Sequence, residues 1–404
     1  MFKTKVSLKQ LLIYLFIVSL IYQSGSVRAA LLREGVLFQL TRVLMLVVPI
    51  CLLCRYRIKK NVILYIGICL LIGIWVVLIN YFLYPDGILH LAYKIVIFLL
   101  SGVLYIDFKS KGISINDYIY RVLVALAIIT LLFYFLAEII KFPMSYFVVY
   151  SGNSYRYYNY YEIFFTYHYN QVLPRLSGLF WEPGVYQIYL NWALFLYIFE
   201  EKENKRELLV LLSSIILTKS TSGYCIAAVL MVVYINKSRF FSKKNRMLLT
   251  IVGITFASII SAVVVYKKVQ TTGNDIYGSA FLRFSDISNG LSIFFKYPFT
   301  GVGFGNETEF MELDIHGRGS SNGLISYAYM TGIIGLVIAL YPFFRNIRIS
   351  SYKLRQWIWT IMILIFNSTE PIYNLPVMAY ILAVEYVTAF KKTRIEKGKI
   401  ENGL

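Results

Sequence analysis

Long apolar runs recur along the chain and constrain its fold more than any other feature. A chain of 404 residues that is 58% hydrophobic and only 15% charged is too apolar for a soluble domain. Many of its runs approach the roughly 20 residues that a helix needs to cross a bilayer. They lie at 11–22, 36–54, 62–84, 88–106, 119–140, 178–199, 208–217, 223–235, 247–266, 323–344, 357–366 and 372–390. The sequence therefore predicts an all-α integral membrane protein, a single polytopic membrane domain over residues 1–404 with 12 transmembrane helices.

Basic residues gather in alternate loops between these runs. The net charge is +19, and in a membrane protein such an excess of Lys and Arg marks the cytoplasmic loops rather than a nucleic-acid surface. The clusters lie at 3–9, 55–60, 109–111, 202–206, 237–246, 345–355 and 391–399. This alternation predicts that both termini are cytoplasmic and that nucleic acid is not a partner.

The amino terminus has two interpretations. Its basic start, apolar run and Val27-Arg28-Ala29 resemble a cleavable signal peptide. Arginine is unusual beside such a cleavage site, which favours an uncleaved first span. Removing this span would leave the remaining topology unchanged.

Two segments on the opposite, external side are too long to be simple connections. The first loop, 141–177, is crowded with tyrosine, and the second, 267–322, combines glycine, serine and charged residues. Long loops in a compact protein are usually functional or disordered. Their aromatic and glycine content favours function.

Charged residues inside the apolar runs fall at one depth once the orientation is assigned. Arg42, Lys94, Glu138 and Glu182 all lie toward the external leaflet. A single such residue is readily explained by snorkelling of its charge to the interface. Four of them below two long external loops favour a polar site at that surface.

Arginines in the external segments indicate what such a site binds. Arg175, Arg283 and Arg318 lie there, and guanidinium binds phosphate oxygens through two parallel hydrogen bonds. At a lipid boundary this chemistry suits a lipid diphosphate. Glu182 and His316 are the available proton-transfer groups.

The glycine-rich stretch Pro298-Phe-Thr-Gly-Val-Gly-Phe-Gly305 has two interpretations. It looks like a phosphate-cradling loop, yet no alternation of strands and helices surrounds it, which disfavours a nucleotide site. Tight turns where the external loop folds back onto the membrane are favoured instead.

Several motifs in the second half occur in a specific order. They are Arg175-Leu-Ser-Gly178 with Glu182-Pro-Gly184, Leu217-Thr-Lys-Ser-Thr-Ser-Gly223, Arg283 upstream of the glycine-rich stretch, and Asn322-Gly-Leu followed by Thr331-Gly-Ile-Ile-Gly-Leu336. This arrangement resembles the O-antigen polymerase (Wzy-type) and O-antigen ligase superfamily. The first half is similar to it only in topology.

The resemblance implies an enzyme of the bacterial inner (cytoplasmic) membrane whose two long external loops are periplasmic. At the periplasmic face it would join undecaprenyl-diphosphate-linked oligosaccharides by inverting sugar transfer, without a metal or other cofactor. The resemblance also implies that Arg175 and Arg283 hold diphosphate or glycan, and that Glu182 organises the first loop or transfers a proton. Family members often have His-Asn before the tenth span, whereas this chain has Ser321-Asn322 with His316 upstream. His316 therefore stays a candidate base.

The sequence thus favours a glycosyltransferase that polymerises O-antigen or capsular repeat units in polysaccharide (lipopolysaccharide) biosynthesis. We expect Glu182, His316 and Arg283 to be catalytic. The expected substrate-binding residues are Arg175, Arg318, Arg42, Lys94, Asn322 and Tyr186. The expected partners are the lipid-linked glycan and membrane lipid. Whether a chain-length regulator is a further partner is left open by the sequence. The alternatives are a ligase that transfers glycan to lipid A-core and, from another class, a lipid-oligosaccharide flippase.

Overall fold

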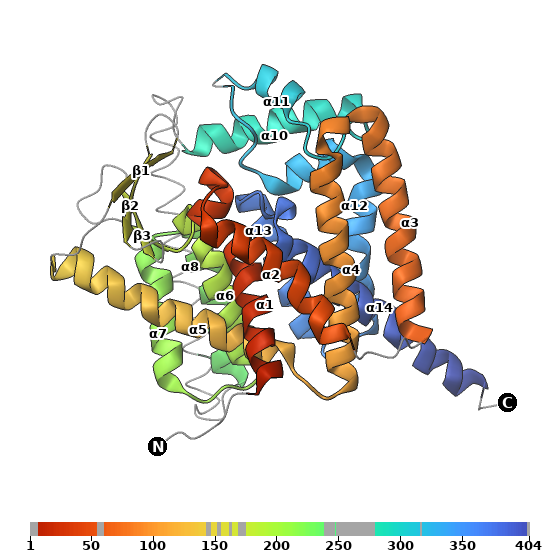
Figure 1. Ribbon diagram of the computed structural model, residues 1–404, viewed down its shortest axis with the longest axis horizontal. Helices are drawn as coiled ribbons and strands as arrows, with labels where there is room; N and C mark the ends of the chain where they lie inside the picture. Colours follow the sequence, from red (N-terminus) through yellow and green to blue (C-terminus); the bar gives the residue numbers. More distant parts are fainter. Residues whose placement is uncertain are drawn as a thin grey trace. The chain divides into compact units, whose positions relative to one another are not determined.

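The chain is mostly helical and divides into two compact units. The computed structural model describes residues 7–54, 60–142, 147–151, 155–160, 164–168, 175–237, 247, 279–315 and 317–401. Unit 1 comprises Met1–Leu20, Leu40–Ile115 and Phe281–Leu404, and unit 2 comprises Ile21–Gln39 and Asn116–Ala280. Figure 1 traces the elements of both units in chain order.

Unit 1 is built from helices whose apolar sequences satisfy their backbone hydrogen bonds internally, as membrane depth requires. Most of α1 and α2 belongs to it. Its elements are α1 (Leu8–Gln23), α2 (Val36–Leu53), α3 (Lys60–Leu83), η2 (Pro85–Gly87), α4 (Ile88–Ser110), α10 (Ser279–Lys296), α11 (Thr308–Leu313), α12 (Gly323–Ile349), α13 (Lys353–Thr369), η4 (Ile372–Asn374) and α14 (Pro376–Glu401). Helix α14 packs along α4 and α12, α3 packs along α4, and α12 packs against α13.

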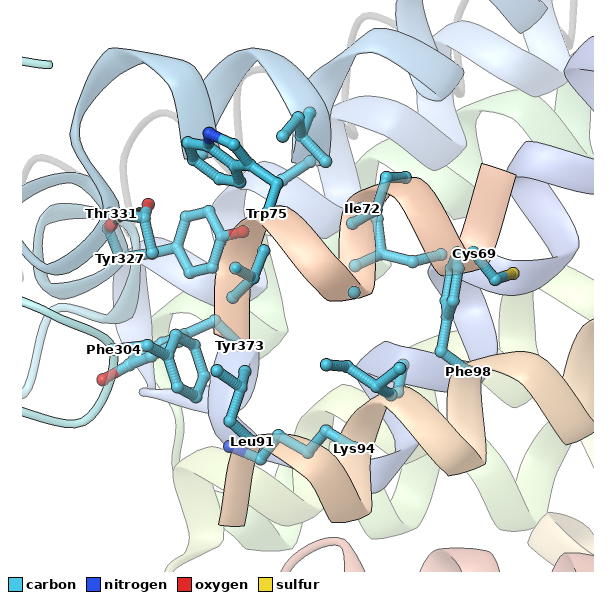
Figure 2. A pocket seen from close by; sticks show the side chains of 18 of the residues that line it. Cys69, Ile72, Trp75, Leu91, Lys94, Phe98, Phe304, Tyr327, Thr331 and Tyr373 are labelled. Carbon is cyan, nitrogen blue, oxygen red and sulfur yellow. Dashed lines mark hydrogen bonds between the residues drawn. The ribbon is translucent and has the colours of Figure 1, made fainter. Parts of the chain in front are cut away.

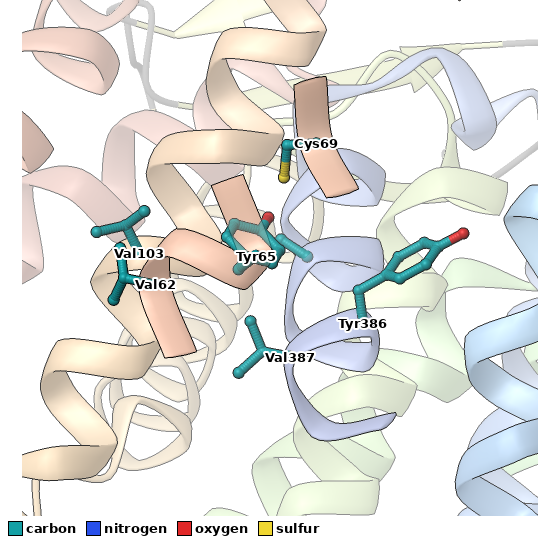
Figure 3. Close-up of a cluster of buried hydrophobic side chains, with 7 residues drawn as sticks. Val62, Tyr65, Cys69, Val103, Tyr386 and Val387 are labelled. Carbon is teal, nitrogen blue, oxygen red and sulfur yellow. The ribbon is translucent and has the colours of Figure 1, made fainter. Parts of the chain in front are cut away.

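A buried cluster from α3, α4 and α14 joins these three helices (Figure 3). The Tyr65 hydroxyl donates to the Phe98 carbonyl oxygen at 2.5 Å, which ties α3 to α4. At Gly102 an added Cβ would lie 2.0 Å from Tyr65 Cζ, so the two helices approach closely only because this residue is glycine. The buried members of the cluster are Val62, Tyr65, Cys69, Val103, Ala383, Tyr386 and Val387.

Unit 2 centres on α6, every residue of which from Pro183 to Ile198 is buried. Helices α7 and α8 and strand β4 pack against it. The elements of the unit are η1 (Arg28–Leu32), α5 (Ile115–Tyr134), η3 (Phe135–Ile139), β1 (Phe147–Ser151), β2 (Tyr155–Tyr160), β3 (Phe164–His168), β4 (Arg175–Gly178), α6 (Pro183–Phe199), α7 (Lys205–Thr218) and α8 (Thr221–Lys237).

The first predicted loop carries a small antiparallel sheet in the order β1-β2-β3-β4. Val149 pairs with Tyr157, and Tyr157 pairs with Tyr167 on the next strand. Aromatic and β-branched residues favour strands, and this composition explains the sheet. The prediction of an all-α chain is therefore corrected to a mostly helical chain with one sheet in the described part.

Five described helices are long and apolar enough to cross a membrane, and the predicted count of twelve is not confirmed. The five lie at Val36–Leu53, Val62–Leu83, Pro85–Ser110, Ile115–Ile139 and Gly323–Ile349, and shorter apolar helices lie at Leu8–Gln23, Thr221–Lys237 and Pro376–Phe390. The predicted seventh span is a helix of 14 residues. At about 1.5 Å per residue it is shorter than the roughly 30 Å hydrocarbon core. The predicted ninth span, 247–266, lies outside the described residues apart from Met247. The chain is a multi-pass membrane protein.

Candidate functional site

Helix α12 is broken at Gly332, inside what the sequence predicts as one continuous span. The backbone there has φ 63° and ψ −169°, a non-helical conformation that glycine adopts without strain. An added Cβ would lie 2.3 Å from the carbonyl oxygen of Phe299. The break therefore coincides with a close approach of the glycine-rich segment, which comprises residues 298–305.

The glycine-rich segment provides hydrogen-bond partners on both sides of this break. The hydrogen bonds run from Val302 N to Tyr329 O at 3.0 Å, from Gly303 N to Met330 O at 3.0 Å and from Ile333 N to Pro298 O at 2.8 Å. Gly301, Gly303 and Gly305 all have positive φ, so the predicted tight turns are present. A non-helical segment at membrane depth requires such internal partners.

Asn80, near the end of α3, holds the backbone of Phe304, which follows Gly303 in the glycine-rich segment. Its Nδ2 donates to the Phe304 carbonyl oxygen at 3.2 Å, and its Oδ1 accepts from the Phe304 amide at 2.5 Å. The Phe304 ring centroid lies 4.4 Å from Lys94 Nζ. The segment therefore places an aromatic face against a buried ammonium group.

Lys94 lines a cavity of about 120 Å³ within unit 1 (Figure 2). Its walls come from α3, α4, α12 and α14, together with Phe304 and Tyr373, and they are mostly apolar. Lys94 is only 7% exposed. Tyr327, Thr331 and Tyr373 also line it, and the hydroxyls of Thr331 and Tyr373 donate to the Tyr327 carbonyl oxygen at 2.6 Å and to Met330 Sδ at 3.2 Å. An apolar cavity with one cation suits a ligand that carries both an apolar tail and a negative charge.

Arg318 is held by two buried carboxylates. Its Nη2 lies 3.1 Å from Asp314 Oδ1 and 3.2 Å from Asp286 Oδ1, and its Nε donates to Asp314 Oδ2 at 3.3 Å. The second oxygen of Asp286 accepts from the Ser321 amide and hydroxyl. These contacts give Arg318 a structural role, and its predicted contact with substrate stays a prediction.

Arg283 differs from Arg318 in having no such partner. It lies one turn before Asp286 on α10 and is half-buried. Within the described ranges it forms no hydrogen bond and no ion pair. Its guanidinium therefore keeps its donors available, which agrees with its predicted role without testing it.

Arg42 and Asn322 have local partners. The Arg42 guanidinium lies 5.2 Å from the ring centroid of Tyr93, and the residue is exposed. Asn322 is the N-cap of α12, since its Oδ1 accepts from the Ile325 amide at 3.1 Å. Asn322 therefore stabilises the helix that carries the break at Gly332.

Arg175, in unit 2, binds the carboxyl end of α7. Its Nε donates to the Thr218 carbonyl oxygen at 2.9 Å and its Nη2 to the Lys219 carbonyl oxygen at 3.3 Å. A cation at this end of a helix also interacts favourably with the helix dipole. Arg175 thus joins β4 to the break between α7 and α8.

Glu182 and Tyr186 lie at the start of α6. Glu182 is the N-cap residue, with an extended backbone, and is half-buried. Tyr186 is 1% exposed, its ring stacks on Phe180 with centroids 5.3 Å apart, and its hydroxyl bonds the Thr130 hydroxyl. These contacts describe a packing role for Tyr186, and its binding of substrate stays a prediction.

The predicted residues therefore divide between the units. Arg42, Lys94, Arg283, Arg318 and Asn322 belong to unit 1. Arg175, Glu182 and Tyr186 belong to unit 2, and the convergence of Arg175 with Arg283 stays a prediction. His316 lies outside the described residues.

Glu307 was missed by the sequence analysis. It follows the glycine-rich segment by two residues and immediately precedes α11. Its carboxylate lies over Gly319, where an added Cβ would be 2.0 Å from Glu307 Oε2. Burial raises the pKa of Glu307. A polar loop residue has no periodicity to indicate burial, so only the tertiary structure identifies it.

No group of three or more His, Cys, Asp or Glu side chains in the described ranges has the arrangement of a metal site. Arg283 and Lys94 are cationic residues of unit 1 whose chemistry suits an anionic group. No known protein family matches the chain, and no curated protein is significantly similar to it. The proposed chemistry of the site therefore rests on its own residues.

Proposed function

We propose that the protein polymerises oligosaccharide repeat units carried on undecaprenyl diphosphate, as in O-antigen or capsular polysaccharide synthesis. The reaction takes place at the periplasmic face of the bacterial inner membrane and inverts the anomeric centre. The observation that carries this proposal is the apolar cavity with the buried Lys94 ammonium beside the glycine-rich segment.

The cavity supports an amphipathic, anionic ligand. Its apolar walls on α3, α4, α12 and α14 suit part of a prenyl chain, and the Lys94 ammonium suits a phosphate oxygen. A charge buried at membrane depth is costly and commonly marks a binding site.

Cationic side chains favour this reaction because its leaving group, the lipid diphosphate, is an anion. When the acceptor hydroxyl attacks the anomeric carbon, the bond to the lipid diphosphate breaks and negative charge develops on the departing oxygen. Lys94 and Arg283 stabilise that charge, and neither a nucleotide nor an activated donor of another kind is needed. Arg318 positions the segment before α12 through Asp286 and Asp314.

Gene deletion tests the function against its alternatives. Loss of a polymerase leaves single repeat units on the surface acceptor. Loss of a ligase instead accumulates long lipid-linked polymer, and loss of a flippase leaves repeat units on the cytoplasmic side. Gel analysis of surface polysaccharide and of extracted lipid-linked glycan separates these outcomes, and either of the last two contradicts the proposal.

The role of Arg283 is tested with Arg283→Ala, expressed in the deletion strain in place of the wild-type protein. We expect long chains to disappear at normal protein levels, because one donor to the leaving group is lost. Arg283→Lys is also expected to impair synthesis, since a point charge does not replace the planar guanidinium. Arg348→Ala, at an exposed position of α12, is the matched control and is expected to keep the normal ladder. Normal ladders from both Arg283 variants would contradict the role of this residue.

A further inference from the structure

Glu307 differs from the neighbouring carboxylates in its lack of partners. Asp286 and Asp314 pair with Arg318, and Glu309 accepts from Lys296 Nζ at 3.0 Å and from the Tyr297 hydroxyl at 2.9 Å. Glu307 is half-buried, and its side chain caps no helix. Within the described part of the chain, its carboxylate accepts no hydrogen bond and forms no ion pair.

Glu307 does not itself line the cavity that contains Lys94, but it closely follows a segment that reaches this cavity. Phe304, three residues earlier, lines the cavity, and so does Tyr373. The negative charge of Glu307 acts on the phenol groups of Tyr373 and of Tyr329 on α12. Glu307 therefore follows the segment that borders the space we assign to the lipid diphosphate, and this placement rests on Phe304 and Tyr373 in the cavity wall.

The surroundings of Glu307 keep its proton affinity high. Burial raises its pKa, and the neighbouring cations Arg318 and Lys296 are bound to other carboxylates. A base is most effective when its pKa lies near the working pH. The ionisable groups on the surrounding elements are Arg283, Asp286, Lys296, Glu309, Glu312, Asp314, Arg318, Tyr329 and Tyr373, and His316 lies outside the described residues.

We propose that Glu307 is the general base of the transfer, an assignment that rests on the proposed function. Its carboxylate takes the proton of the acceptor sugar hydroxyl as that oxygen forms a bond to the anomeric carbon of the donor. The bond between the anomeric carbon and the diphosphate breaks at the same time, and the lipid diphosphate leaves with the electron pair. Glu307 then loses the proton to water. The step needs no further reactant.

The direct test is Glu307→Gln in proteoliposomes that contain a lipid-diphosphate-linked oligosaccharide. Glutamine keeps the size of the side chain but accepts no proton, and a lost general base lowers kcat by about 10²- to 10⁴-fold. Binding of the lipid-linked substrate is expected to stay within about twofold of wild type, because the charge on the lipid contacts Lys94 and Arg283. Glu312→Gln, at an exposed position of the same helix α11, is the matched control with an unchanged rate.

The pH profile separates a base from a structural residue. The base form is the ionised carboxylate, so the wild-type rate falls as the pH falls through the raised pKa of Glu307. Glu307→Gln is expected to lose this acid limb, while Glu307→Asp keeps a limb displaced to lower pH, since aspartate has the lower intrinsic pKa. If the glutamine variant does not fold, the aspartate variant is the test: an acid limb displaced to lower pH supports the assignment of Glu307 as the base, and an acid limb at the wild-type pH contradicts it.

Gly319→Ala offers a test of position that keeps the carboxylate. The new methyl group would lie 2.0 Å from Glu307 Oε2, so the carboxylate has to move. We expect slower turnover with the acid limb retained. A wild-type rate with an unchanged acid limb in Glu307→Gln would overturn the assignment while leaving the polymerase proposal intact. An inactive wild-type protein, with substrate bound but no linkage formed, would overturn the proposed function itself.

Discussion

Two carboxylates of unit 1 occupy opposite kinds of environment. Glu385 on α14 accepts from Asn346 Nδ2 at 2.5 Å, from Gln356 Nε2 at 3.0 Å and from Trp359 Nε1 at 2.9 Å. Glu307 has no donor among the described residues. Buried polar groups in native proteins are normally hydrogen-bonded, and the exceptions are often functional. Glu385 therefore joins three helices, whereas the Glu307 carboxylate retains unused acceptor capacity for a ligand.

Among the variants that test this contrast, Lys94→Met is expected to have the largest effect on activity. Removal of a buried charge that contacts a charged ligand group costs about 3 kcal/mol, which is about a hundredfold in kcat/KM. The free energy of unfolding is expected to hold or rise, because methionine fits an apolar cavity without a charge. Steady-state kinetics in proteoliposomes measures the first effect and thermal unfolding the second. Lys353→Met, at an exposed position of α13, is the control, and equal kinetics for the two variants would contradict the role of Lys94.

Glu385→Ala is expected to show the reverse pattern. Three donors lose their acceptor, which lowers the free energy of unfolding by about 3 kcal/mol. The kcat of the protein that remains folded is expected to stay near wild type. Glu385→Gln keeps one acceptor oxygen and is expected to cost about 1 kcal/mol. An unchanged melting temperature for the alanine variant would remove the contrast between the two carboxylates.

Gly332→Ala tests the break in α12. The positive φ and the 2.3 Å approach to Phe299 both oppose a side chain, and we expect a loss of about 2 kcal/mol. Activity is expected to fall as well, because the glycine-rich segment that carries Phe304 is displaced. Gly67→Ala in α3 is the control, since its Cβ would meet nothing within 4 Å. Equal melting temperatures for the two variants would show that the close packing of residues 298–305 against α12 at Gly332 is not needed for stability.

Arg175→Ala is expected to have the smallest effect on stability. The variant loses the hydrogen bonds to the carbonyl oxygens of Thr218 and Lys219, which contribute about 1 kcal/mol in total. Arg206→Ala, at the exposed start of α7, is the control for charge. Loss of long glycan chains beyond that of equally destabilised variants would support the predicted contact of Arg175 with diphosphate. Full activity would restrict Arg175 to its helix contact.

The sequence predicted the helices better than the site. Helices α2, α3 and α4 begin and end within a few residues of the predicted spans, because long uniform apolarity leaves the backbone little choice. The break at Gly332 was missed, since a single glycine is compatible with a helix and its conformation depends on residues 298–305. The sheet was missed because the tyrosine-rich segment 141–177 was interpreted as a functional loop without regular structure of its own.

The side-chain partners depend on contacts between distant segments. Arg318 and Asp314 are four residues apart, so their pairing could have been predicted, but the contact with Asp286 could not. Lys94 was predicted as an intramembrane charge and lies on a helix long and apolar enough to cross a membrane, while its aromatic partner Phe304 lies 210 residues away in the chain. Glu307 carries no local signal at all, because burial by Gly319 and its neighbours appears only in the fold.

The most direct measurement is the stoichiometry of the reaction in proteoliposomes that contain the purified protein and one lipid-diphosphate-linked repeat unit. The account predicts a ladder of longer glycans, with one lipid diphosphate released for every linkage formed, and loss of both products in Lys94→Met and Arg283→Ala. Movement of the intact lipid-linked unit across the bilayer without new linkages would contradict it.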